Sequence, residues 1–401
     1  MLYPFVAVSV AETAKTADTS ETAKTVDTPD TPETANIVVG ADRIDVIKGL
    51  VKRKRIGLIA NQTSVLRDNT HLLDVLLQEG FNVIKIFAPE HGFRGTDDGG
   101  AMVKNNVDAE TGLPVVSLYG DKFKPSDEHL ADIDVIIFDI QDVGVRFFTY
   151  ISTMHYAMEA CAENGKEFIL LDRPNPNDYI DGPVRKEGYR SFVGVDPIPV
   201  VYGLTVGELA RMINGEGWIS KGEKSCRLTV VPMLNWRHGE PYSLTVKPSP
   251  NLPNDRAIML YPSLCLFEGT SISVGRGTRF PFQTLGYPDR KYGDFTFVPQ
   301  SIKGMDANPI YRDKTCHGVD LREVEPERKI SLAYLISFYE KSGRNEKAFF
   351  NRADWFDLLA GSDELRRQII KGFSADEIQA SWQDDLDDYK KIRRKYLIYP
   401  E

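Results

Sequence analysis

The sequence lacks any apolar run long enough to cross a membrane, and it lacks an excess of positive charge. A membrane-spanning helix needs about 20 consecutive apolar residues, and no run in the 401 residues approaches that length. The 49 basic residues are outnumbered by 58 acidic ones, which gives a net charge of −9. That balance argues against a protein that binds nucleic acid through its phosphate backbone. The hydrophobic share of 42% is ordinary for a globular protein.

Cysteine is scarce and widely spaced. The four cysteines are Cys161, Cys226, Cys265 and Cys316, and no two of them form the CxxC pair of a zinc knuckle. Histidine-based zinc motifs such as HExxH are missing too. The first predicted strand continues into NQTSV rather than into a Gly-rich turn, so a dinucleotide is not expected. We therefore expect neither a metal nor any other cofactor.

The first 36 residues have a composition of their own. The apolar run LYPFVAVSVA ends in small residues, and ETAKT then occurs twice, nine residues apart, in a stretch of mostly Thr, Ala, Asp, Glu and Lys. Such a stretch has too little apolar content to fold, so we expect Glu12 to Asn36 to be a disordered tether. The apolar run resembles the end of a signal peptide without its basic start. This pattern favours an exported protein, periplasmic or in the cell envelope.

From Arg43 onward, short apolar segments alternate with amphipathic ones. RIGLIAN, FNVIKIFAP, VVSLY, IDVIIFDI, KEFILLD and RLTVVPM each predict a buried strand, and segments such as THLLDVLLQEG and TYISTMHYAMEACAENG between them predict helices. Continuous apolar strands separated by helices are typical of a parallel sheet covered on both faces. The sequence therefore predicts a Rossmann-like, doubly wound α/β domain over residues 37–255.

The alternation stops after Asp255. A stretch rich in Gly, Pro and aromatic residues follows, and then several helical segments, the last of them the charged DEIQASWQDDLDDYKKIRRKY. This pattern predicts a second, smaller α+β domain over residues 256–401, which ends in a solvated helix.

Polar side chains gather where the predicted parallel strands end. Ligands of such sheets bind at the carboxyl ends of the strands, so these side chains are candidates for a shared site. The candidates are Asn61, Gln62, Glu90, His91, Asp139, Gln141, Asp142, Arg146, Tyr150, Asp172, Arg173 and Asn175.

Some of these candidates also fit structural roles. Asn61 could cap the next turn. Asp172 with Arg173 could be an ion pair that holds their loop, and Asp142 with Arg146 could pair on a helical turn, since they are four residues apart.

Glu90 is the strongest candidate of the set. It stands between Pro89 and His91 at the mouth of a predicted strand, where a carboxylate has no evident capping role. His91 could orient Glu90, bind substrate or bond to a loop carbonyl.

Two segments near and beyond residue 255 add further candidates. The segment KPSPNLP places Ser249 and Asn251 between prolines, and CLFEGTSISVGRGTRFPF carries Glu268, Thr270 and Arg276 among glycines. Glycine lets a backbone adopt positive φ or approach a ligand closely. We expect both segments to line a cleft.

Six motifs in order resemble one known family. NQTS, FAPEHGFRG, FDIQDVGVRFFTY, LDRPNP, KPSPNLP and FEGTSISVGRGT are together similar to the NamZ-type exo-β-N-acetylmuramidases, long described only as a bacterial domain of unknown function. The similarity runs from about Ile44 to the C-terminus. It implies a glycosidase that removes N-acetylmuramic acid from the non-reducing ends of peptidoglycan fragments, with an active site between a Rossmann-like domain and a smaller C-terminal domain.

The resemblance also implies a role for one residue. The family's glutamate in PEHG falls on Glu90, as the proton donor to the leaving oxygen. The second group stays open: Asp142 or Glu268 could be nucleophile or base, or the N-acetyl group of the substrate could attack. An arginine would bind the lactyl carboxylate of muramic acid, and the candidates for it are Arg146, Arg173 and Arg276.

Two alternatives compete with this hypothesis. The cleft could bind peptidoglycan without cleaving it, in a non-catalytic envelope protein. The chain could also be a metal-dependent hydrolase, whose ligands would be Glu90, His91, Asp139, Asp142 and His155.

Overall fold

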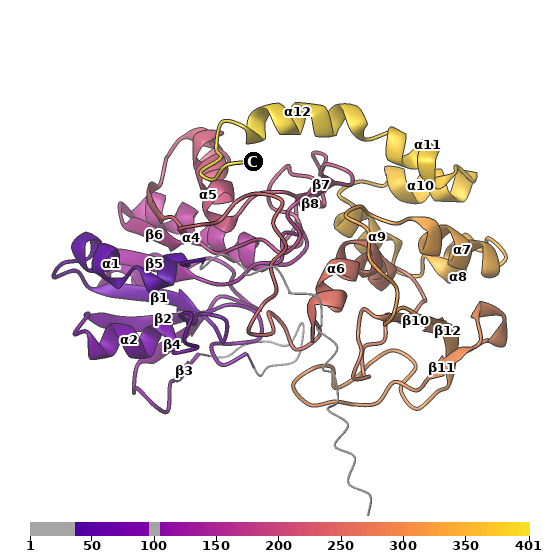
Figure 1. Ribbon diagram of the computed structural model, residues 1–401, viewed down its shortest axis with the longest axis horizontal. Coiled ribbons are helices and arrows are strands. Elements are labelled where there is room, and N and C mark those ends of the chain that lie inside the picture. Colours follow the sequence, from indigo (N-terminus) through magenta and orange to yellow (C-terminus); the bar gives the residue numbers. More distant parts are fainter. Residues whose placement is uncertain (1–36, 96–104) are drawn as a thin grey trace, which may run out of the picture. The chain divides into compact units, whose positions relative to one another are not determined.

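A seven-stranded sheet forms one half of the computed structural model, which describes residues 37–95 and 105–401 (Figure 1). The strand order is β3-β4-β2-β1-β5-β6-β9, and every neighbouring pair is parallel except β3 with β4. The strands are β1 Ile56–Ala60, β2 Val83–Ala88, β3 Asn106–Val107, β4 Pro114–Ser117, β5 Val135–Asp139, β6 Glu167–Leu171 and β9 Arg227–Val231. The predicted Rossmann-like α/β fold is confirmed. The predicted leader and tether, residues 1–36, lie outside the described residues.

Helices cover both faces of this sheet. Successive side chains of a strand point to opposite faces, and in β1 Leu58 and Ile59 accordingly belong to different hydrophobic clusters. The cluster of Leu58 includes side chains of α1 (Ile44–Leu50) and α2 (Leu72–Gln78). The cluster of Ile59 includes side chains of α3 (Asp127–Leu130), α4 (Tyr150–Asn164) and α5 (Val206–Gly215). Every residue of β1 and β5 is buried, as expected for a sheet covered on both faces.

The order in which strands are added to the sheet changes direction beside β1. After β1 it adds β2 and β4 on one side, and it then returns to add β5, β6 and β9 on the other. In doubly wound sheets the crevice at such a reversal, outside the carboxyl ends of the strands, is where ligands bind. The loops after β2 and β5 leave the sheet at this edge.

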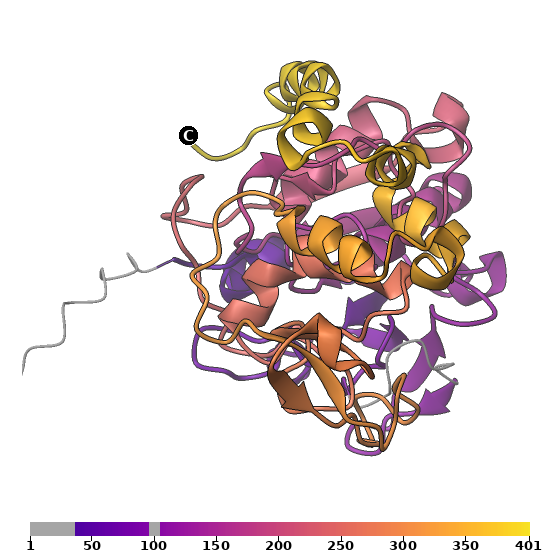
Figure 2. The ribbon, with the colours of Figure 1, turned by 90° about the vertical axis from the view of Figure 1, so that its right-hand side faces the viewer.

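The C-terminal region combines a small antiparallel sheet with helices. Its strands pair in the order β10-β12-β11, and in Figure 2 they lie below the helices that follow them in the sequence. The elements are α6 Asp255–Leu264, β10 Thr284–Tyr287, β11 Phe295–Phe297, β12 Cys316–Asp320, α7 Ala333–Lys341, α8 Glu346–Phe349, α9 Ala353–Ala360, α10 Glu364–Lys371, α11 Ala375–Ala380 and α12 Gln383–Arg393. Residues 37–401 cluster as one unit, and one hydrophobic core joins Phe138 of β5 to Leu264 of α6 and Phe356 of α9.

Short elements complete the described chain. They are the 3-10 helices η1 Gly40–Asp42, η2 Ile219–Gly222, η3 Cys265–Gly269 and η4 Arg290–Tyr292, and the paired strands β7 Ile180–Asp181 and β8 Val201–Tyr202.

The C-terminal helix is anchored to the first half of the chain. Inside α12, which we expected to be solvated, the Tyr389 hydroxyl donates a hydrogen bond to the Tyr202 carbonyl at 2.7 Å. The tail after it returns to the sheet, where the Tyr399 hydroxyl donates to Asp172 Oδ2 at 2.6 Å. Figure 1 shows this tail ending beside α5. The last residues therefore help to hold together the seven-stranded sheet and the helices and loops that precede α6, which we call the first region.

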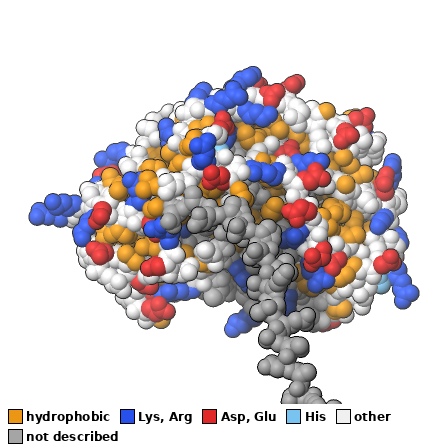
Figure 3. Space-filling model, viewed as in Figure 1, with side chains coloured by type: hydrophobic (Ala, Val, Ile, Leu, Met, Phe, Trp, Pro, Cys, Tyr) orange, Lys and Arg blue, Asp and Glu red, His pale blue; other side chains and the backbone are white. Residues whose placement is uncertain are grey.

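Charges of both signs are mixed over the face shown in Figure 3. None of the helices in the two described ranges has the length and apolar character that a membrane span requires.

Candidate active site

A pocket of about 780 Å³ opens beside the carboxyl ends of the parallel strands. Its wall combines loops of the first region with η3, the loop after η3, the segment 306–311 and α9. The predicted site residues that line it are Glu90, His91, Ser249, Asn251, Glu268, Thr270 and Arg276. The structure thus brings the motif after β2 together with KPSPNLP and the Gly-Arg-Gly loop.

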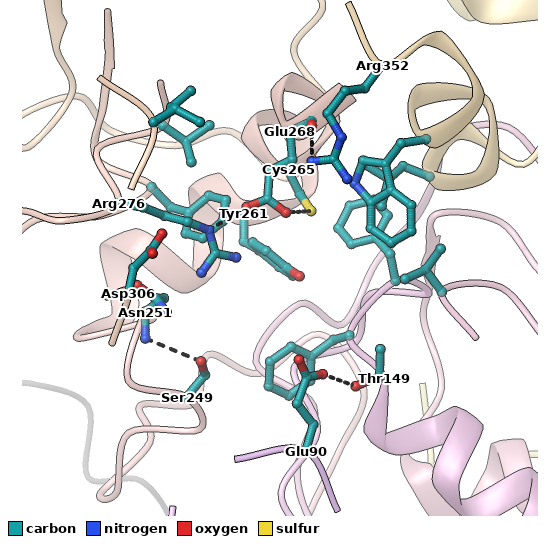
Figure 4. A pocket seen from close by; sticks show the side chains of 18 of the residues that line it. Glu90, Thr149, Ser249, Asn251, Tyr261, Cys265, Glu268, Arg276, Asp306 and Arg352 are labelled. Atoms are coloured by element: carbon teal, nitrogen blue, oxygen red, sulfur yellow. Dashed lines mark hydrogen bonds and ion pairs between the residues drawn. The ribbon is translucent and has the colours of Figure 1, made fainter. Parts of the chain in front are cut away.

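Glu90 is oriented by the segment that follows β5. Thr149 Oγ1, directly before α4, donates a hydrogen bond of 2.6 Å to Glu90 Oε2. Figure 4 shows the Glu90 carboxyl group turned into the open space of the pocket. The backbone after it turns sharply, because His91 adopts φ +68° and Gly92 φ +77°. Positive φ is costly for a residue other than glycine and often marks a functional site.

Two tyrosines lie close enough to Glu90 for its charge to affect them. Burial, followed by the charge and hydrogen bonding of Glu90, raises the pKa of Tyr119 well above its usual value. Burial and the charge of Glu90 also raise the pKa of Tyr150. Both phenols are protonated at neutral pH, as an ordinary tyrosine is, and can act as hydrogen-bond donors.

His91 and the KPSPNLP segment hold each other in place. His91 Nε2 lies 3.1 Å from Ser249 Oγ, which also accepts a bond from the Asn251 backbone N–H at 3.2 Å. Gln62 Nε2 donates to the Lys247 carbonyl at 3.1 Å, and the Tyr150 hydroxyl donates to the Pro248 carbonyl at 3.1 Å. Gln62 and Tyr150 therefore position this wall without lining the pocket themselves.

Glu268 and Arg276 form an ion pair in the wall contributed by the C-terminal region. Arg276 Nε donates to Glu268 Oε1 at 2.5 Å, and the guanidinium lies 5.2 Å from the ring centre of Phe282. Burial lowers the pKa of Arg276, but the adjacent Glu268 carboxylate outweighs burial and raises it overall. Figure 4 shows the terminal nitrogens of this guanidinium turned toward the pocket. The chain thus offers a fixed positive charge beside a carboxylate.

The glycines around Arg276 allow the tight loop that presents it. Gly275 and Gly277 have φ values of +80° and +78°. A Cβ on Gly277 would approach the Gln300 carbonyl oxygen to 2.6 Å, closer than such contacts occur. This is the physical reason for glycine on both sides of the arginine.

The other predicted site residues lie outside the pocket lining. They are Asn61, Gln62, Asp139, Gln141, Asp142, Arg146, Tyr150, Asp172, Arg173 and Asn175. All of them except Gln62 are buried, and most have polar partners within the fold.

The charged members of this group are engaged inside the protein. Arg173 forms a two-bond ion pair with Asp139, at 2.6 and 2.8 Å. Asp142 accepts bonds from the Tyr202 hydroxyl and, at 2.6 Å, from the Gly144 N–H, and burial raises the pKa of Asp142 to about 7.

Arg146 donates to the carbonyls of Pro183, Ile198 and Leu359 at 2.7 to 2.9 Å. Burial lowers its pKa to about 9. Its guanidinium therefore ties the first region to the end of α9 and faces no part of the pocket.

The polar members connect neighbouring loops. Gln141 Nε2 donates to the Pro174 carbonyl at 2.7 Å, and Asn175 Nδ2 donates to the Leu204 carbonyl at 3.0 Å. Asn61 Oδ1 accepts from the Thr63 N–H at 2.9 Å, in the capping role considered above. Asp172 accepts bonds from Thr205, Gly207 and Tyr399, and burial raises its pKa to about 6.

Several pocket residues were missed by reasoning from the sequence. Tyr119 ends the predicted strand VVSLY, so the rule of strand ends could have found it, whereas Thr149 begins the predicted helix TYISTMHYAMEACAENG, well beyond the end of β5. Phe192, Asp306 and Trp355 come from loops and helix termini that carry no motif. Within residues 37–95 and 105–401, no three His, Cys, Asp or Glu side chains are grouped so as to hold a metal ion.

Comparison with known proteins assigns both halves of the chain to one family. Residues 56–256 match "Exo-beta-N-acetylmuramidase NamZ, N-terminal", and residues 259–399 match the corresponding C-terminal description. A "Peptidoglycan beta-N-acetylmuramidase NamZ" of Bacillus subtilis (strain 168) is 38% identical over 373 residues, which are 88% of each chain.

Two crystal structures of DUF1343 family proteins from Bacteroides fragilis share the fold. One is 44% identical, with a TM-score of 0.84 over 92% of this chain and 100% of its own. The other is 33% identical, with a TM-score of 0.78 over 90% and 99%. The chain therefore belongs to the NamZ family of exo-β-N-acetylmuramidases, as the six motifs indicated.

Proposed function

We propose that this chain is an exo-acting glycoside hydrolase that releases N-acetylmuramic acid from the non-reducing ends of peptidoglycan fragments, with Glu90 as general acid and base. One observation carries the proposal. Glu90, at a carboxyl end of the sheet, shares a single pocket with Glu268 and Arg276 of the C-terminal region. Family membership supplies the substrate class, since the Bacillus subtilis relative is named for peptidoglycan.

The size of the pocket suits a short saccharide. Pockets for small ligands enclose roughly 300 to 1,000 Å³, and this one encloses about 780 Å³.

The two carboxyl groups suit glycoside cleavage. One carboxylic acid protonates the leaving oxygen, and a second group meets the positive charge that develops at the anomeric carbon. Thr149 fixes the orientation of Glu90 toward the pocket. Of the two carboxylates considered as the second group, Glu268 lines the pocket, whereas Asp142 is buried beside Tyr202. We assign this role to Glu268, either in direct attack or in orienting the N-acetyl group of the substrate.

Arg276 is the arginine best placed to recognise muramic acid. N-acetylmuramic acid differs from N-acetylglucosamine by a lactyl ether that carries a carboxylate, and guanidinium groups bind carboxylates through two parallel bonds. Arg146 and Arg173 are committed to carbonyls and to Asp139. Arg276 uses Nε for Glu268 and directs its terminal nitrogens into the pocket.

The test is product analysis on a defined disaccharide with N-acetylmuramic acid at its non-reducing end. Release of free N-acetylmuramic acid, from that end only, supports the proposal. Glu90→Gln should abolish release, whereas Glu325→Gln, whose side chain is 86% exposed, should not. Saccharide binding without turnover by the unaltered protein would favour the non-catalytic alternative. Loss of activity on exhaustive chelation would favour the metal-dependent one.

We also propose export to the periplasm or cell envelope. The composition of residues 1–36 supports it, and so does a substrate that belongs to the cell wall. Fractionation of cells that express the full chain tests it, and recovery of the protein only with cytoplasmic markers would contradict it.

A further inference from the structure

Three aromatic side chains form one wall of the pocket, which we call the aromatic wall: Tyr119, Phe123 and Phe192. Phe123 and Phe192 are stacked, with ring centres 4.0 Å apart and an interplanar angle of 22°. Tyr119 lies 5.9 Å from Phe123 and 5.7 Å from Phe192. All three are partly exposed to solvent, although rings that served only to fill the core would be buried.

Side chains of α4 support the aromatic wall on the side away from the pocket. Tyr156 of α4 lies parallel to Phe192, with ring centres 6.3 Å apart. The Ser152 hydroxyl, also in α4, donates a 2.7 Å bond to the Phe192 carbonyl. His155 of the same helix pairs with Asp196 at 2.8 Å, four residues further along the Phe192 loop. One face of α4 thus fixes the loop that carries Phe192.

The aromatic wall adjoins the proposed acid. Tyr119 is close enough to Glu90 for that carboxylate to raise the pKa of the phenol. The charged part of the pocket, with Glu268 and Arg276, comes from the C-terminal region, whereas Tyr119, Phe123 and Phe192 all come from the first region. The pocket therefore combines the Glu268–Arg276 pair with the aromatic wall, and Glu90 adjoins this wall through Tyr119.

This division sets the direction of the substrate. A general acid must lie at the bridging oxygen, with one sugar on each side of it. The carboxylate of the muramic residue belongs beside Arg276, which leaves the aromatic wall next to Glu90 for the other sugar. The C–H bonds of a pyranose ring with equatorial substituents form an apolar face that packs well on aromatic rings.

We propose that the aromatic wall is the subsite for the leaving sugar, the pyranose bonded to the terminal muramic residue. The assignment rests on the function proposed above. It predicts that the wall contributes to cleavage only when the leaving group is large enough to reach it.

Two substrates separate this role from a structural one. The first is the muramic-acid-terminated disaccharide with N-acetylglucosamine as leaving sugar, and the second is the β-fluoride of N-acetylmuramic acid, whose leaving group is a single fluoride ion. Phe192→Leu keeps apolar volume and removes the ring. It should lower kcat/KM for the disaccharide on the order of tenfold and change hydrolysis of the fluoride less than twofold. Phe373→Leu, at an exposed aromatic outside the pocket, is the matched control and should change neither.

A binding measurement tests the proposal independently of catalytic activity. Saturation-transfer NMR with free N-acetylglucosamine should show contact with the unaltered protein and a clear loss in Phe192→Leu and Phe123→Leu. Equal loss of activity on both substrates, or undiminished binding in both variants, would overturn the proposal. If the unaltered protein cleaves neither substrate, the proposed hydrolase function fails, and the NMR result still decides whether the wall binds the sugar.

Discussion

Replacing Arg276 with lysine should reduce the preference for muramic acid over glucosamine. Lysine keeps a positive charge beside Glu268 but cannot form the two parallel bonds that a guanidinium forms with a carboxylate. Arg276 and Glu268 are only 27% and 19% exposed, so solvent screens this region weakly. One hydrogen bond to a charged group contributes about 1.5 kcal/mol or more, which corresponds to a loss of about tenfold.

The assay is a ratio of specificity constants. Aryl β-N-acetylmuramide and aryl β-N-acetylglucosaminide differ only in the lactyl ether, so any effect of the substitution on Glu268 or on folding cancels. We expect Arg276→Lys to lower the ratio of kcat/KM values about tenfold. Where the glucosaminide is cleaved too slowly, inhibition by the two free sugars gives the same ratio.

Arg352→Lys is the control for this experiment. Arg352 also lines the pocket, but its guanidinium lies 5.4 Å from the Trp355 ring centre and donates to the Glu268 carbonyl at 3.3 Å. We expect this change to leave the ratio as it is. An unchanged ratio in Arg276→Lys, or a loss in Arg352→Lys instead, would refute the reasoning.

Three further predictions concern the supports of the site and the fold. Thr149→Val should lower kcat about tenfold with little change in substrate affinity, because it removes the 2.6 Å hydrogen bond to Glu90. Thr149→Ser keeps the hydroxyl and should have nearly the kcat of the unaltered protein, so equal activity of the two variants would contradict this prediction. Asp139→Asn should cost about 3 kcal/mol in urea unfolding, because it leaves Arg173 buried without its carboxylate, and a loss below about 1 kcal/mol would be inconsistent with that pair. Burial lowers the pKa of His238, but Asp178 and Glu208 outweigh it and raise the pKa to about 9. This ion pair should therefore contribute its full stabilisation below pH 6.5, and the free energy of unfolding should fall by up to about 3 kcal/mol as the pH rises through 9. If His238→Gln has the same dependence of unfolding free energy on pH as the unaltered protein, this contribution is excluded.

The sequence was most informative where one local rule decides the structure. The apolar segments predicted the parallel strands because a sheet covered on both faces leaves no room for polar side chains between its ends. Glu90 stood out because it follows such a strand between Pro89 and His91, and the structure places it in the pocket.

The same rule could not say which polar side chains face the ligand. Asp139 ends β5, but its side chain is buried against Arg173, whereas Thr149, ten residues later, contacts Glu90. Which way such a side chain points depends on packing between strand ends, and no local pattern encodes that. The position of Phe192 could not be predicted from the sequence either, because it depends on hydrogen bonds between its loop and α4.

The contacts that anchor the C-terminal helix could not be predicted from the sequence either. A charged helix such as α12 predicts exposure, and most of its surface is indeed polar. Its contacts join positions nearly two hundred residues apart, as between Tyr389 and Tyr202. Sequence periodicity carries no signal for pairs of this kind.

The central claim is tested most directly by measuring turnover and binding of one muramyl disaccharide in the same preparation of Glu90→Gln. Loss of the acid should lower kcat by a factor of a thousand or more, roughly the share that acid–base groups contribute, while the dissociation constant of the disaccharide changes little. Turnover that persists within tenfold of the unaltered protein would show that the side chain at position 90 is not the group that protonates the departing sugar.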